Sequence, residues 1–169
     1  AKLKFTKHET KKCLNWLSKK GIKKSDKFIC IIIRDSEYLS INNKDNVDFS
    51  YHDFRNSELD NYNIGIKHIL NQGFFVIRMG KNMKKKLNFK HPKLIDYSFD
   101  IEKNDCLDIW LFANCFGTIS TGTGPDVLSS IYNKPILFIN FLPLLYLHSF
   151  SHSITIPKTL IWKNNKKKL

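Results

Sequence analysis

The sequence is short of the motifs that mark several common classes of protein. It contains neither a G-x-G-x-x-G run nor a P-loop, which disfavours a dinucleotide oxidoreductase and a P-loop kinase. Its four cysteines form no C-x-x-C pair, so we expect free, mostly buried thiols and no zinc site. It shows no signal peptide, and no apolar run approaches the roughly 20 residues of a membrane-spanning helix. These absences lead us to expect a soluble, cytoplasmic protein.

Acidic residues are also scarce, because 15 Asp and Glu stand against 28 Lys and Arg, for a formal charge of +13 at pH 7. Such a charge ordinarily suggests nucleic acid or an anionic membrane as the partner. Here the lysines are scattered and accompanied by many Asn and Ile, which indicates a compositional bias rather than a binding face. We therefore expect no nucleic-acid partner. The apolar run Phe138–Leu147 leaves room for peripheral contact with the inner face of a membrane.

Apolar runs and helical periodicities alternate along the chain. Continuous β-branched runs indicate strands covered on both faces, as in a parallel sheet, and the alternation of strands with helices predicts a three-layer α/β sandwich around a mainly parallel sheet. At 169 residues the chain is long enough for one domain. The predicted strands are 28–33, 74–77, 94–97, 116–119 and 135–140, with an edge strand at 154–156; the predicted helices are 8–20, 57–72, one from 104 onward and 126–132.

The connections between these elements carry two further signals. Ser57 and Asp60 resemble a capping box at the start of the second helix. The polar, aperiodic segment 36–51 is interpreted as a long surface loop, and long loops in compact domains usually carry function. The first residue is Ala rather than Met and the first helix begins almost at once, so we interpret residues 1–169 as part of a longer protein.

Four predicted strands end in polar or glycine-containing steps. Ligands of an open parallel sheet bind at the carboxyl ends of its strands, so we expect all four steps along one rim. Arg34 and Arg78 would suit a diphosphate, because the guanidinium fork matches phosphate oxygens. The alternative for either arginine is a weak surface ion pair, such as Arg34 with Asp35. The four steps are Arg34-Asp35, Arg78-Met79-Gly80, Asp96-Tyr97 and Ser120–Gly124.

The step Ser120–Gly124 leads from a predicted strand directly into a predicted helix. Unpaired N–H groups and the helix dipole favour an anion there, and glycines let the backbone approach it closely. Ser120, Thr121 and Thr123 add hydroxyl donors. The segment therefore predicts a phosphate-binding turn. An ordinary turn with Thr123 as N-cap and Pro125 in the first helical turn explains this segment alone equally well.

Motifs succeed one another in a fixed order over roughly residues 28 to 140, and Arg55-Asn56 and Ile77–Gly80 are the most specific of them. The series resembles a family of bacterial glycosyltransferases associated with surface-polysaccharide biosynthesis. More distantly, the strand that ends in Arg34 is similar to the H-V-R motif of fucosyltransferases, with Ile32 in place of the His. The motifs are Arg34-Asp35, Tyr51-x-x-x-Arg55-Asn56, Val76–Gly80, Asp96-Tyr97-Ser98, Leu107-Asp108-Ile109 and the Ser120-Thr121-Gly122 turn.

The resemblance implies a Rossmann-like, GT-B-type transferase that uses a nucleotide sugar, with residues 1–169 as the donor-binding, C-terminal part of two lobes. Arg34 and Arg78 would bind the donor diphosphate, Asp96 a ribose or base edge, and Arg55 the sugar, unless Arg55 only holds the 36–51 loop. The acceptor would be a glycan or lipid-linked glycan. The implied donor site comprises Arg34, Arg55, Asn56, Arg78, Gly80, Asp96, Ser120, Thr121, Gly122, Thr123 and Gly124.

The general base and the cofactor are less well defined by the sequence. Asp35 and Asp53 are candidates for the base, and each is equally explained as a turn or ion-pair residue. GT-B enzymes often need no divalent metal, and the chain has no D-x-D. His148 and His152 are four residues apart but have no third ligand in sight. We therefore expect no metal and no cofactor besides the nucleotide-sugar substrate.

Three other hypotheses stay open. A polysaccharide pyruvyl transferase would use the same basic rim for phosphoenolpyruvate. A non-catalytic nucleic-acid-binding module predicts lysines gathered on one face with stacked aromatics, whereas the aromatics here occupy apolar positions. A degenerate transferase-like domain is motivated by Ile32 and by an apparently missing N-terminal lobe.

Overall fold

The computed structural model describes residues 3–43, 47–147 and 152–159. They form an α/β fold around one six-stranded sheet in which every pairing is parallel. The strand order β3-β2-β1-β4-β5-β6 is that of a Rossmann fold, which confirms the predicted architecture. The strands are β1 (Phe28–Ile32), β2 (Phe75–Arg78), β3 (Leu94–Ile95), β4 (Gly117–Ser120), β5 (Ile136–Phe141) and β6 (Ser153–Pro157).

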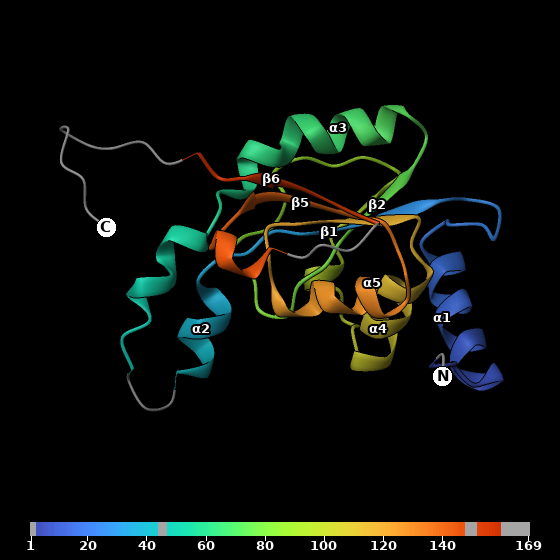
Figure 1. The fold of residues 1–169 in the computed structure, drawn as a ribbon. Helices are drawn as coiled ribbons and strands as arrows, with labels where there is room; N and C mark the ends of the chain where they lie inside the picture. The colour runs from blue at the N-terminus through green and yellow to red at the C-terminus, as the bar shows by residue number, and fades with distance from the viewer. Residues whose placement is uncertain (1–2, 44–46, 148–151, 160–169) are drawn as a thin grey trace.

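Helices cover both faces of the sheet (Figure 1). Helices α1 (Lys7–Lys19), α4 (Asp105–Asn114) and α5 (Val127–Ile131) lie on one face, and α3 (Asn63–Asn71) lies on the other. Helix α1 begins with a capping box, in which Thr6 accepts from the Glu9 N–H and Glu9 accepts from the Thr6 N–H.

Residues of the two central strands alternate between the two faces. Cys30 and Ile32 of β1 and Ile77 of β2 pack against α1 and α4, whereas Ile31 and Val76 pack against α3. Full burial of one such aliphatic side chain stabilises the fold by about 1.5–3 kcal/mol. The same alternation decides on which face the residue at the end of each strand lies, because successive side chains point to opposite faces.

The segment 36–51 differs from the predicted long loop. It contains the short helix α2 (Glu37–Asn42), and a 3-10 helix, Ser50–Arg55, comes after it. Asp35 explains the start of α2, since its Oδ1 accepts a hydrogen bond from the Glu37 N–H at 3.0 Å. The polar composition of 36–51 does not reveal this helix, because the acceptor for its first N–H groups is Asp35, which lies just before the segment.

The predicted capping box at Ser57 does not form. The Ser57 N–H donates to the Arg34 carbonyl at 3.0 Å, which ties this residue to the end of β1 instead. The chain then enters a 3-10 helix, Leu59–Tyr62, and continues as α3. The helix predicted over 57–72 is confirmed in its second part, where Tyr62 and Ile66 are buried in the core on the α3 face of the sheet.

Three of the four cysteines are buried and the fourth, Cys106, is half-buried, and all four are free thiols as predicted. Within the described ranges, no helix is both long and apolar enough to cross a membrane. In the apolar run 138–147, Phe138 and Phe141 belong to the core, and 144–147 is exposed. Peripheral membrane contact stays a prediction. His148 lies outside the described residues.

Candidate functional site

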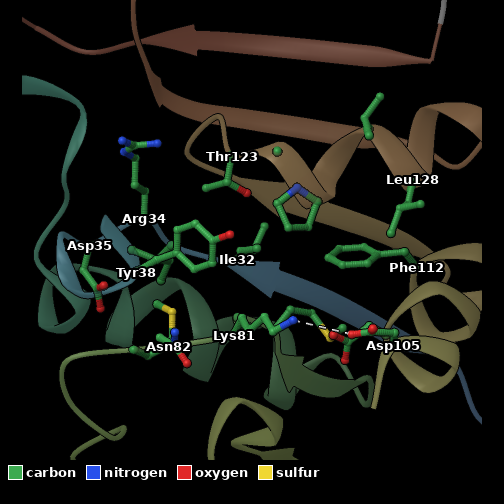
Figure 2. Close-up of a pocket in the computed structure, with 18 of the residues that line it drawn as sticks. Ile32, Arg34, Asp35, Tyr38, Lys81, Asn82, Asp105, Phe112, Thr123 and Leu128 are labelled. Carbon is green, nitrogen blue, oxygen red and sulfur yellow. Dashed lines mark ion pairs between the residues drawn. The ribbon is translucent and has the colours of Figure 1, made fainter. Parts of the chain in front are cut away.

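A cavity of about 720 Å³ opens at the carboxyl ends of β1, β2 and β4. From β1 the sheet continues with β2 and β3 on one side and with β4, β5 and β6 on the other. The strand order therefore reverses between β1 and β4. Open α/β sheets bind ligands at such a reversal. Figure 2 shows this cavity, and five predicted site residues line it: Arg34, Asp35, Gly80, Thr123 and Gly124.

Arg34 and Arg55 bring two cationic side chains together beside the cavity. Burial lowers the pKa of Arg34, and the nearby positive charge of Arg55 lowers it further. Within the part of the chain that the structure describes, neither guanidinium forms an ion pair. Two half-buried guanidinium groups repel each other unless an anion lies between them, so the arrangement favours a bound anion.

Unsatisfied polar atoms concentrate around the same pair. The Nε atoms of Arg34 and Arg55, Asn56 Oδ1 and Ser57 Oγ are all buried without a hydrogen-bond partner among the described residues. Buried polar atoms in native proteins are almost always hydrogen-bonded, and the exceptions call for an unseen water, ion or ligand. Arg55 and Asn56, which the sequence singled out, therefore lie close to Arg34, and all three side chains have buried atoms without a hydrogen-bond partner.

Arg55 also holds its own segment in place, as one of the sequence alternatives proposed. Its Nη2 donates to the Gly122 carbonyl at 3.2 Å, which joins the 3-10 helix Ser50–Arg55 to the turn after β4. The Arg34 N–H in turn donates to Thr121 Oγ1 at 2.8 Å. The backbone around the two arginines is thus fixed, and fixed donors lose less entropy when they bind.

Three N–H groups of the turn, those of Thr121, Gly122 and Thr123, already have hydrogen-bond partners, whereas the sequence suggested free N–H groups here. The carboxylate of Asp126 accepts from Thr123 N–H at 2.7 Å and from the Ser120 hydroxyl at 2.6 Å. The Ser120 hydroxyl accepts from Gly122 N–H at 3.0 Å, and Thr121 N–H donates to the Ile32 carbonyl. Asp126 is buried and occupies the place where an anion was expected.

This turn is therefore the ordinary strand-to-helix turn that the sequence left open, with Thr123 as N-cap of the 3-10 helix Gly124–Asp126 and Pro125 in its first turn. Gly122 has φ +80, and a Cβ added there would lie 2.9 Å from the ring of Phe141. A glycine is required at this position for packing rather than for approach to a ligand.

Arg78 and Asp96 lie apart from the cavity and bind each other. Arg78 is 1% exposed, and its Nη1 contacts both Asp96 oxygens at 3.2 Å and the Lys85 carbonyl at 2.8 Å. Arg78 lies two residues after Val76 in β2, so both side chains are on the face of the sheet that α3 covers. The cavity lies on the opposite face, which α4 and α5 cover. The structure therefore brings Arg34 together with Arg55 and not with Arg78.

The two carboxylates considered as general bases have partners or lie elsewhere. Asp35 lines the cavity, but its oxygens accept from the Glu37 and Lys84 N–H groups at 3.0 and 2.9 Å. Asp53 is exposed, accepts from the Asn56 amide at 3.0 Å and is absent from the cavity lining. Asp35 thus binds backbone N–H groups, whereas Asp53 binds the side chain of Asn56.

One face of α4 contributes residues to the cavity that the sequence analysis did not place there. Asp105, Asp108, Ile109 and Phe112 recur at helical spacing and all line it. Asp108 comes directly after the buried Leu107, and Trp110 to Ala113 are buried as well, so a carboxylate in an otherwise apolar stretch was the available signal. Figure 2 places Asp105 and Phe112 at the end of the cavity opposite Arg34.

Asp108 is half-buried, and burial raises the pKa of its carboxyl group, an effect partly offset by a hydrogen bond from Tyr97 and by Lys103. The Tyr97 hydroxyl donates to Asp108 Oδ1 at 2.5 Å and fixes the carboxylate in place. Lys103 directs its ammonium at the carbonyls of Gly80, Lys81 and Ser98.

Comparison with protein-family models, with curated proteins and with solved structures finds no match. The fold and the geometry of the site define a Rossmann-like α/β protein with a cavity at its topological reversal and two arginines beside it.

Proposed function

We propose that this chain is the donor-binding domain of a GT-B-type glycosyltransferase, which transfers a sugar from a nucleotide sugar to a surface glycan or a lipid-linked acceptor. The observation that supports the proposal most strongly is the Arg34–Arg55 pair, which has no anionic partner among the described residues and lies beside a 720 Å³ cavity. A diphosphate supplies two adjacent negative groups for two guanidinium forks.

Such a pair would act on the leaving group. As the bond between the anomeric carbon and the diphosphate oxygen breaks, negative charge grows on the departing nucleoside diphosphate. Donors that are already oriented stabilise this charge without further reorganisation. Arg55 is held by Gly122 and the Arg34 backbone by Thr121, so both positions are fixed before the donor arrives. Asp35 and Asp53 are not assigned as the base in this proposal.

The experiment is calorimetric titration of the protein with UDP, GDP, ADP, CMP, phosphoenolpyruvate and inorganic pyrophosphate, repeated with Arg34→Gln and Arg55→Gln. We expect a nucleoside diphosphate and pyrophosphate to bind, and each variant to weaken both about 10-fold or more. Lys158→Gln is the matched control, because it removes a nearby cation whose ammonium donates to the carbonyls of Phe54 and Asn56 and forms no ion pair among the described residues.

The other outcomes discriminate among the alternatives. Binding of phosphoenolpyruvate but not of nucleotides would favour pyruvyl transfer. Binding of DNA or RNA that weakens steeply with salt, with no nucleotide response, would favour the basic module. The absence of any response to all six anions would contradict the proposed function.

A further inference from the structure

We propose that the end of the cavity formed by α4 is a base subsite selective for guanine, in which the Asp108 carboxylate accepts hydrogen bonds from the N1–H and 2-amino groups of the base. The inference rests on the proposed function, because it takes the Arg34–Arg55 pair as the diphosphate site. It goes further by naming the nucleotide as a guanosine diphosphate.

The first support is the layout of the cavity. Figure 2 shows Arg34 and Asp35 at one end and Phe112, Leu128 and Asp105 at the other. Asp108 lies on the same face of α4, between Asp105 and Phe112 in the sequence, so it belongs to the end opposite the arginine. A nucleotide whose phosphates bind Arg34 would reach the α4 face with its base.

The second support is the chemistry of the walls. Ile32, Phe112, Pro125 and Leu128 line the cavity with apolar surface, which suits the two flat faces of an aromatic base. Both methionines of the chain, Met79 and Met83, line it as well. Methionine adapts its shape and contacts aromatic rings favourably through sulfur.

The third support is the state of the Asp108 carboxylate. One oxygen accepts the Tyr97 hydroxyl, and among the described residues the carboxylate forms no ion pair and its second oxygen accepts no hydrogen bond. The free oxygen of this half-buried carboxylate can therefore accept hydrogen bonds from a ligand in the cavity. The neighbouring ammonium of Lys103 is bound to three backbone carbonyls, and Asp105 pairs with Lys81 at 3.7 Å.

Guanine fits this requirement better than the other bases. Its N1–H and 2-amino groups form two parallel donors on one edge, and a carboxylate accepts both. Uracil offers one N–H flanked by two carbonyl oxygens, which the carboxylate would repel, and adenine has a ring-nitrogen acceptor at the corresponding position. A good bidentate pair discriminates by about 10- to 100-fold against the wrong base.

The experiment measures dissociation constants by calorimetry for GDP, IDP, xanthosine diphosphate, UDP, ADP and pyrophosphate. We expect the wild type to bind GDP about 10-fold or more tightly than IDP, which lacks the 2-amino group, and than UDP or ADP. Asp108→Asn should lose the preference for GDP and gain affinity for xanthosine diphosphate, because the amide donates to the added 2-oxo group. Pyrophosphate binding should stay unchanged.

Asp105→Asn is the matched control. It removes the same charge from the same helix face, but Asp105 is 85% exposed and should leave the order of base preference intact. Equal affinities for GDP, UDP and ADP in the wild type, or an unchanged GDP preference in Asp108→Asn, would overturn the guanine assignment. Pyrophosphate binding that persists undiminished in both arginine variants would instead contradict the proposed function, so the two failures are distinguishable.

Discussion

The chain has only three arginines, and the structure uses them in two opposite ways. Arg78 is buried and paired with Asp96, and its charge is neutralised within the fold. Arg34 and Arg55 have no carboxylate partner among the described residues. The Nε atoms of all three arginines are buried without a hydrogen bond, so the difference lies in the carboxylate partner. The contrast teaches that an arginine at the end of a buried strand does not by itself mark a ligand site. The absence of a carboxylate partner for such an arginine is the feature that points to a ligand site.

The largest effect on stability is expected when the Arg78–Asp96 ion pair is broken. Arg78→Gln removes the partner of Asp96 and should lower the free energy of unfolding by roughly 2–3 kcal/mol, since Asp96 is only partly exposed and keeps other donors. Urea denaturation measures the change. Pyrophosphate affinity should stay within about twofold of wild type in the folded fraction, and a loss of binding without a loss of stability would reverse the roles assigned to the arginines.

A second variant separates the arginine pair from the glycine-rich turn. Asp126→Asn weakens the hydrogen bonds from Ser120 and Thr123 and should cost about 1–2 kcal/mol of stability. It also removes a buried negative charge near the proposed anion site, so pyrophosphate affinity should be maintained or increased. Abolition of binding in this variant, with the fold intact by circular dichroism, would show that the turn and not the arginine pair holds the anion.

The fold was largely predictable from the sequence, for a physical reason. Continuous runs such as Phe28–Ile33 can only be covered on both faces, and that requirement fixes a parallel sheet between helix layers. The order of strands was not predicted, because it depends on packing between elements that are distant along the chain.

The site was predictable in part. The position of Arg34, Gly80 and Thr123 at one rim is a consequence of strand direction, but the sequence does not reveal which carboxylate pairs with which arginine. Asp96 and Asp126 lie 18 and 6 residues from the groups they bind, Arg78 and Ser120, and only folding brings them there. For the same reason the sequence suggests Arg55 as a sugar ligand or a loop anchor, and only the fold makes it the neighbour of Arg34.

A smaller effect on stability is expected when Arg34, which has no carboxylate partner among the described residues, is replaced. Arg34→Gln should change the free energy of unfolding by no more than about 0.5 kcal/mol, because the variant removes a desolvated charge that has no partner and relieves repulsion with Arg55. The same urea denaturation used for Arg78 gives the comparison. A destabilisation equal to that of Arg78→Gln would mean that Arg34 has a structural partner and would remove the contrast.

The smallest effect concerns pH. Burial raises the pKa of Asp108 above the ordinary aspartate value of about 3.9, so the folded protein binds this proton more tightly than the unfolded chain. The contribution of Asp108 to stability is therefore present at low pH and lost as the pH rises through the raised value. Relative to wild type, Asp108→Asn should become progressively more stable over that rise, which urea denaturation at several pH values measures.

Tyr97, Lys103, Asp105 and Lys81 are the other titratable groups around Asp108, and they remain in both proteins. Their contributions should cancel in the difference between variant and wild type. A difference in stability that does not vary with pH would indicate that Asp108 is solvated like an ordinary surface aspartate, and would weaken its assignment as a desolvated acceptor.

The most direct test observes the three arginines themselves. Each arginine Nε–H gives one signal in a ¹H–¹⁵N NMR spectrum, and Arg34→Lys and Arg55→Lys assign two of the three signals. We expect pyrophosphate to shift the signals of Arg34 and Arg55 together, with one dissociation constant, and to leave the signal of Arg78 in place. A shift of the Arg78 signal alone, or no shift of any of the three, would contradict the proposal that the unpaired arginines form the anion site.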